Sequence, residues 1–146
     1  MILFLDFDGT CHPFDWLAAG ARQFCYLPRI EAVLREFDFV KIVISSEWRR
    51  YHPLSELSQQ FAEDMRPRLI GATPELPGTA SELVPGARRR EAMAFLQRNA
   101  LPDRWVALDD LGVLWEPLQP NVILCADGFC EREEDALRHF LQTAPL

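Results

Sequence analysis

The sequence lacks any apolar run long enough to cross a membrane and any pair of closely spaced cysteines. Its apolar runs fall well short of the ~18 residues that a membrane span needs, and no basic residue precedes Asp6 in the apolar start. The four cysteines, which form no C-x-x-C motif, are Cys11, Cys25, Cys125 and Cys130. Their spacing argues against a zinc site and against a disulfide framework. These absences predict a soluble cytoplasmic protein with reduced thiols and no membrane partner.

The chain also lacks an excess of basic residues. It has 15 Lys and Arg against 22 Asp and Glu, which gives a formal net charge of −7. This balance disfavours nonspecific binding to phosphate backbones, so nucleic acid stays open as a partner but is not favoured. A chain of 146 residues with 49% hydrophobic residues suits one globular domain, which we expect to span residues 1–146.

Short apolar runs alternate with helical patterns along the chain. The expected strands are rich in apolar and β-branched residues and cover 2–5, 39–44, 68–70, 105–108 and 122–125. The expected helices, each with an apolar face, cover 27–37, 52–61, 88–99 and 131–141. The stretch 73–86 is rich in Pro and Gly and is expected to be a loop. Strict alternation predicts an α/β fold with a parallel sheet of about five strands and helices on both faces.

Polar side chains follow three of the expected strands. They are, in chain order, Asp6 and Asp8, Ser45 and Ser46, and Asp109 and Asp110. Ligands of open parallel sheets bind beyond the carboxyl ends of the strands, so these side chains are expected to meet there. Carboxylates crowded together repel one another unless a cation is present, and hard oxygen ligands suit Mg²⁺ better than zinc. The pattern therefore predicts a Mg²⁺ site made by the four acids.

These motifs, in this order, resemble those of the haloacid dehalogenase (HAD) superfamily of phosphotransferases. DFDGT follows the first apolar run, Ser follows the second, an Arg cluster opens a later helix, and a pair of Asp follows the next strand. VISSEWR, LIGATP and ALDD also look like a group of small HAD-like proteins related to the HAD module of RNA-repair proteins. The resemblance implies a three-layer α/β/α Rossmann-like fold and a Mg²⁺-dependent phosphatase. The short intervals between the motifs leave no room for a cap domain.

The resemblance also implies roles for individual residues. Asp6 would attack phosphorus to form an aspartyl-phosphate, and Asp8 would protonate the leaving group and then activate water. Ser45 would hold a phosphate oxygen. The other expected substrate contacts are Ser46, Thr10 and Arg49. Residues i and i+2 of an extended chain point the same way, which lets both aspartates face one phosphate.

Two of the site assignments stay open. The family usually has a Lys in its basic motif, whereas this chain offers Arg88, Arg89 and Arg90. Arg88 is preferred for its spacing to the acid pair. An Arg side chain can supply the positive charge, and its planar guanidinium presents paired N–H donors that suit phosphate oxygens. Family resemblance favours Asp110 over Asp109 as the direct metal ligand, and strand periodicity does not decide between them.

The substrate and the catalytic status also stay open. A site without a cap favours a macromolecular or exposed phosphate, or a homo-oligomer that covers the site. The missing Lys leaves a second function open, a non-catalytic HAD-like module that binds phosphate or a partner. Outside the motifs, His12 is expected at the surface and Trp48 is expected to pack.

Overall fold

A five-stranded parallel sheet forms the centre of the computed structural model, which describes residues 1–78 and 83–144. The strands are β1 (Ile2–Leu5), β2 (Lys41–Ile44), β3 (Leu69–Ala72), β4 (Trp105–Asp109) and β5 (Val122–Leu124). Their order across the sheet is β3-β2-β1-β4-β5, and all neighbours are parallel. The expected α/β class and parallel sheet are confirmed.

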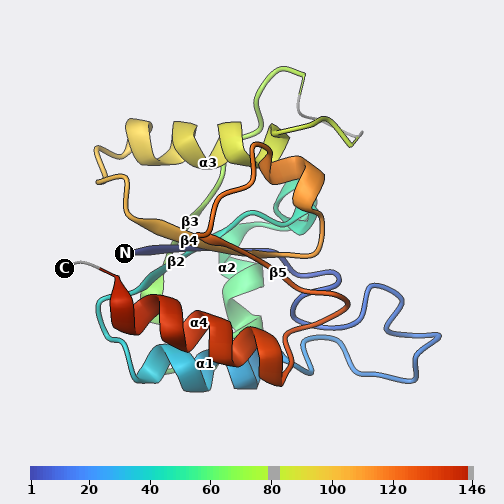
Figure 1. Ribbon diagram of the computed structural model, residues 1–146. Helices are drawn as coiled ribbons and strands as arrows, with labels where there is room; N and C mark the ends of the chain where they lie inside the picture. Colours follow the sequence, from blue (N-terminus) through green and yellow to red (C-terminus); the bar gives the residue numbers. More distant parts are fainter. Residues whose placement is uncertain (79–82, 145–146) are drawn as a thin grey trace.

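Helices cover both faces of this sheet. They are α1 (Leu27–Arg35), α2 (Leu54–Leu57), α3 (Ala87–Arg98) and α4 (Glu131–Thr143). Figure 1 shows α3 on one face and α1, α2 and α4 on the other. Each face has its own apolar core, and the helices alternate with the strands along the chain. The arrangement is the three-layer α/β/α fold, and the described residues contain no inserted cap.

The central strand β1 is buried along its whole length, which explains why all its residues are apolar. Leu3 and Leu5 belong to the core beneath α1 and α4, while Ile2 and Phe4 belong to the core beneath α3. Leu5 pairs with residue 44 of β2 and with residue 108 of β4. The residues that follow these three positions therefore lie side by side at one edge of the sheet.

Some boundaries differ from those expected. The helix expected at 52–61 is the single turn α2 followed by a 3-10 turn at Ser58–Gln60, where the hydroxyl of Ser58 donates to the carbonyl of Ser55. The expected loop at 73–86 contains neither helix nor strand through residues 73–78 and 83–86, and residues 79–82 lie outside the described part. All four cysteines are free thiols. Within the described ranges, no helix has the length and apolar character needed to span a membrane.

Candidate active site

Three acids meet at the carboxyl ends of β1 and β4, where the order of the strands reverses. Asp6 directly follows β1, Asp109 ends β4, and Asp110 comes next. Each offers a carboxylate oxygen, and these oxygens all lie within 4.8 Å of one another. Asp6 and Asp109 are buried, whereas Asp110 is partly exposed. A reversal of strand order is the place where open α/β sheets bind ligands.

Burial and crowding disturb the protonation of this group. Burial raises the pKa of Asp6 well above its usual range, and the neighbouring charge of Asp109 raises it further. Burial also raises the pKa of Asp110, to about 6. A cation would relieve this repulsion, and three hard oxygen donors beside a partly exposed edge suit Mg²⁺. The donor set of Asp6, Asp109 and Asp110 therefore fits the expected metal.

Gly9 lets the chain pass directly beside Asp110. Its φ is +77°, and a Cβ atom placed on it would lie 2.2 Å from Oδ2 of Asp110. Any side chain at this position would displace the carboxylate and would also strain the backbone. The glycine of the DFDGT motif is thus needed for the close approach of two strand ends.

Arg88, in the first turn of α3, supplies the counter-charge. Its Nη1 lies 2.5 Å from Oδ2 of Asp109 and 3.1 Å from Oδ1 of Asp6, and the side chain is buried. Burial alone would lower the pKa of Arg88, but the two aspartates raise it, so the guanidinium stays charged. Of the two neighbouring arginines, Arg89 approaches the carbonyl of residue 117 and Arg90 is exposed. The structure therefore brings Arg88 alone of the three to the acids.

Asp109 is held by two further donors. The indole Nε1–H of Trp115 donates to its Oδ2 at 2.8 Å, and the backbone N–H of Leu111 donates to its Oδ1 at 3.0 Å. With Arg88, these bonds engage both oxygens of Asp109. Asp110 lines the cavity beside the acids and Asp109 does not, and which of the two is the direct metal ligand stays a prediction.

Asp8 lies outside the group of three acids and is held by two ring N–H donors. Nε2 of His12 lies 2.7 Å from its Oδ1, and Nε1 of Trp48 lies 3.0 Å from its Oδ2. The backbone N–H of Phe24 donates to Nδ1 of His12 at 3.0 Å, so Nε2 is the nitrogen that carries the proton. Although burial would raise the pKa of Asp8, these bonds lower it. The carboxylate is thus fixed in orientation and favoured as an anion.

The two serines after β2 have different surroundings. Ser45 is buried beside Asp6, and within the described part of the chain its hydroxyl has no hydrogen-bond partner. The hydroxyl oxygen of Ser46 accepts the backbone N–H of Trp48 at 3.2 Å and caps the 3-10 helix Glu47–Arg50. Buried hydroxyls nearly always have partners, so Ser45 has an unused donor at the edge of the site.

Thr10 and Arg49 make contacts with other parts of the fold. Thr10 is buried, and its carbonyl accepts the N–H of Phe129 at 2.8 Å. The guanidinium of Arg49 donates to the carbonyl of Thr73 at 2.9 Å and is paired with the carboxylate of Glu91. These bonds tie together the segments after β2 and β3 and the helix α3. Arg49 therefore stabilises the packing of these three segments in this structure. Its contact with substrate stays a prediction.

Two neighbouring cavities open beside Asp8. One, of about 100 Å³, is lined by Asp6, Asp8, Phe14, Ser46, Glu47, Arg88, Asp110 and Leu111. The other, of about 270 Å³, is lined by Asp8, Glu47, Trp48, Tyr51 and His52. We call the first the acid cavity and the second the ring cavity. Asp8 and Glu47 border both, while Ser45, Thr10 and Arg49 border neither.

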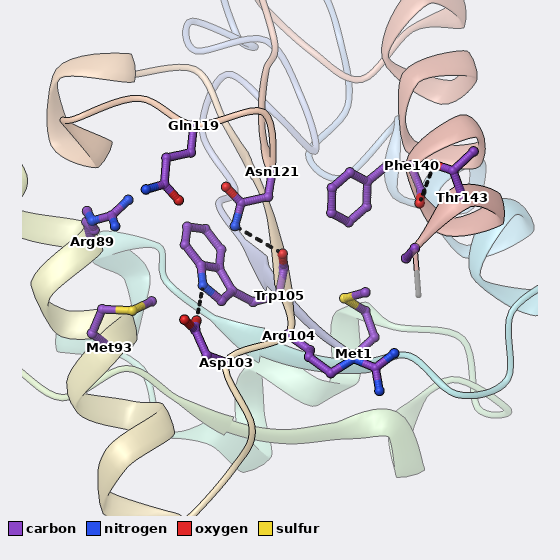
Figure 2. A pocket seen from close by; sticks show the side chains of 11 residues that line it. Met1, Arg89, Met93, Asp103, Arg104, Trp105, Gln119, Asn121, Phe140 and Thr143 are labelled. Atoms are coloured by element: carbon purple, nitrogen blue, oxygen red, sulfur yellow. Dashed lines mark hydrogen bonds between the residues drawn. The ribbon is translucent and has the colours of Figure 1, made fainter. Parts of the chain in front are cut away.

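A third cavity, of about 440 Å³, lies at the amino ends of β1 and β4 (Figure 2). Asp103 is the acid among its lining residues, and it accepts the indole N–H of Trp105 at 2.8 Å. Asn121 donates to the carbonyl of Trp105 at 3.2 Å. This cavity shares no lining residue with the acid cavity, so the expected phosphate chemistry does not lie there.

Sequence reasoning missed several supporting residues of the site. The expectation that His12 lies at the surface is wrong, since His12 is fully buried and hydrogen-bonded to Asp8. Trp48 was expected to pack, and both Trp48 and Trp115 donate indole N–H groups to site aspartates. His12 follows Asp8 by four residues in a turn and not in a helix, so its spacing did not indicate the contact. The two indole contacts depend on tertiary packing and leave no local pattern.

Comparison with known proteins supports the resemblance drawn from the motifs. A family model described as the HAD domain in Swiss Army Knife RNA repair proteins matches residues 2–145. No curated protein and no solved structure matches the chain.

Proposed function

The chain belongs to the family of HAD domains in Swiss Army Knife RNA repair proteins, and from this premise we propose that it is a Mg²⁺-dependent phosphatase of phosphoric monoesters. The observation that carries the proposal is the meeting of Asp6, Asp109 and Asp110 within 4.8 Å, with Arg88 beside them. Acids with raised pKa values beside a buried cation, at the edge of a small cavity, are typical of a reactive site.

In the first step, an oxygen of Asp6 attacks phosphorus while the bond between phosphorus and the leaving oxygen breaks. Asp8 gives its proton to that oxygen, and the phosphoryl group becomes bonded to Asp6. The hydrogen bonds from His12 and Trp48 favour the anion of Asp8. The proton therefore comes to Asp8 with the substrate, since a phosphate monoester has a second pKa of about 6.

In the second step, Asp8 acts as a base. A water gives a proton to its carboxylate and attacks phosphorus, and the bond between phosphorus and Asp6 breaks. Inorganic phosphate leaves and Asp6 is restored. The proton that Asp8 took from water passes to the departing phosphate or to solvent, so Asp8 returns to the anion of the free protein. The two N–H donors suit this step, because they keep the carboxylate of Asp8 pointed in one direction.

Charge on the phosphoryl group is balanced from both sides of the site. Mg²⁺ held by Asp6, Asp109 and Asp110 would neutralise phosphate oxygens as a Lewis acid. Arg88 reaches the same place from the first turn of α3, where the helix dipole also favours anions. The free hydroxyl of Ser45 is a donor for a further oxygen. Arg88 thus takes the place of the Lys that is usual in this position.

The proposal includes the partner and its location. The partner is a phosphorylated substrate whose phosphate is exposed enough to enter an open site, and a homo-oligomer that covers the site is compatible with this. The acidic net charge weighs against long nucleic acids as partners. The free thiols, two of them exposed, support a reducing cytoplasmic location.

Phosphate release from a panel of monoesters, with p-nitrophenyl phosphate as reference, tests this function. We expect release in millimolar Mg²⁺ and none in EDTA. The competing function is a non-catalytic module, and what favours it is the ion pair that already engages Asp6 with Arg88. A folded protein that binds inorganic phosphate but releases none from any ester would establish that alternative.

A further inference from the structure

The walls of the ring cavity carry three rings, and the proposed chemistry uses only the indole N–H of one of them. They belong to Trp48, Tyr51 and His52. Tyr51 is 79% exposed, so its ring is open to a ligand at the wall of the cavity. Trp48 is held in place by ring contacts with Phe7 and Phe24, at centroid distances of 5.7 and 5.3 Å. The ring of His52, which is partly buried, contacts that of Trp48 at a centroid distance of 5.5 Å. The cavity thus combines two packed rings with the exposed ring of Tyr51.

The ring cavity lies on the side of the site from which the leaving group departs. Asp8 borders both cavities, and under the proposed function it gives its proton to the leaving oxygen. That oxygen must be within hydrogen-bond reach of Asp8, so the group attached to it extends toward the ring cavity. This step rests on the proposed function, because it uses the role of Asp8.

The two cavities differ in size and in what borders them. The acid cavity, at about 100 Å³, holds little more than a phosphoryl group, since a water occupies about 30 Å³ of liquid. Tyr51 and His52 line the ring cavity and not the acid cavity. A substrate whose ring stacks on Tyr51 and His52 therefore needs a linking group between that ring and phosphorus. An aryl phosphate has no such spacer, whereas the sugar of a nucleotide supplies one.

Charge limits the leaving group further. The described residues that line the ring cavity include no Lys or Arg, and the carboxylate of Glu47 at its edge is paired with Arg50 at 2.6 Å. The lining itself therefore offers no cation for additional phosphates on the leaving group. Aromatic rings, in contrast, accept the face of any nucleobase.

We propose that the ring cavity is the subsite for a nucleoside leaving group, and that the substrates are nucleoside monophosphates. The base stacks against Tyr51 and His52, the sugar bridges the two cavities at Asp8, and the phosphate enters the acid cavity.

The test compares adenosine 5′-monophosphate with ribose 5-phosphate, which differs from it only by the base. In Mg²⁺, the wild-type protein should have a KM for the nucleotide about five- to 150-fold lower than for the sugar phosphate, as expected for stacking of one base. Tyr51→Ala should remove most of this preference, and Tyr51→Phe should keep it because the ring remains. Leu118→Ala, which truncates an exposed apolar residue outside both cavities, serves as the matched control.

Binding to the Asp6→Asn variant, measured by calorimetry, separates this inference from the proposed function. Tighter binding of the nucleotide than of ribose 5-phosphate, lost with Tyr51→Ala, would support the subsite even if the wild-type protein released no phosphate. Equal binding of the two ligands would overturn it. Two other results would also overturn the assignment: a dependence on Tyr51 as large for phenyl phosphate as for the nucleotide, or faster turnover of an RNA oligonucleotide with a terminal phosphate.

Discussion

Nη1 of Arg88 lies 2.5 Å from Oδ2 of Asp109 and 3.1 Å from Oδ1 of Asp6, so one guanidinium joins the carboxyl ends of β1 and β4. The three side chains are buried together. Arg88 therefore balances the charge of the folded protein, and under the proposed function it also contacts the phosphate.

Arg88→Ala should lower both turnover and stability. Loss of a charge-assisted contact costs about 1.5 to 3 kcal/mol, which is roughly ten- to 150-fold in rate if the contact exists in the transition state. Removing one partner of a buried ion pair costs about 3 to 5 kcal/mol of unfolding free energy. Phosphate release and urea denaturation measure the two effects. Arg88→Lys should recover part of each, while Arg90→Ala, at an exposed position, should change neither.

Asp6→Asn should abolish turnover of p-nitrophenyl phosphate without lowering the melting temperature. Burial already disfavours the charged form of Asp6, so a neutral amide of the same shape fits the fold. Asp8→Asn should instead slow turnover by about 10² to 10⁴-fold, because it removes proton transfer and leaves the nucleophile. Activity retained by Asp6→Asn would rule out the aspartyl-phosphate.

The stabilising effect of Mg²⁺ should grow as pH rises. The pKa values of Asp6 and Asp110 are raised in the folded protein, to about 6 for Asp110. As pH rises above the usual pKa of Asp, the unfolded chain therefore loses these two protons before the folded protein does. The folded state then holds more protons, and the metal-free protein loses stability as pH rises through that window. Mg²⁺ binds the ionised carboxylates, so its shift of the melting temperature should be larger at about pH 7.5 than at about pH 5.

Asp110→Asn is the matched variant for this experiment. It removes one ligand and one source of repulsion, so both the pH slope and the Mg²⁺ shift should shrink. Melting curves that coincide in EDTA and in millimolar Mg²⁺ at both pH values would contradict a metal site at these acids.

Trp48→Phe should raise the pKa of Asp8. The substitution keeps an aromatic ring and removes the indole N–H that donates to Oδ2 of Asp8, one of the bonds that favour the anion. Carboxyl-carbon NMR across a pH titration measures the change directly. Trp16→Phe is the control, because the rings that donate to Asp8 are those of His12 and Trp48. An unchanged titration of Asp8 would mean that the indole N–H of Trp48 does not lower its pKa.

The sheet could be predicted from the sequence because its strands are short, apolar and covered on both faces. The acids of the site could be located for a related reason. Buried strands such as β1 and β4 are otherwise apolar, so carboxylates at their carboxyl ends, Asp6 and Asp109, are easily recognised in the sequence. The edges of elements were harder, since α2 is one turn long and its amphipathic pattern continues into a 3-10 turn.

The helical periodicity of α3 also indicates which of the three arginines faces the acids, independently of the spacing to the acid pair. Arg88 lies four and seven residues before Ala92 and Phe95, which are buried against the sheet, so it shares their face of α3. His12 and the two indole donors could not be placed in the same way. Their contacts require Phe24, Trp48 and Trp115 to be packed first, and no local period encodes that.

The position of β1 in the middle of the sheet also decides when the site can exist during synthesis. Asp6 is made before its partners Arg88 and Asp109, which come much later in the chain. Until β4 is available, one edge of the apolar strand β1 has no neighbour, and such edges promote aggregation of nascent chains. A chain that ends before Trp105 would therefore have an open sheet and would lack Asp109 and Asp110. The acidic centre can form only after β4 has paired with β1.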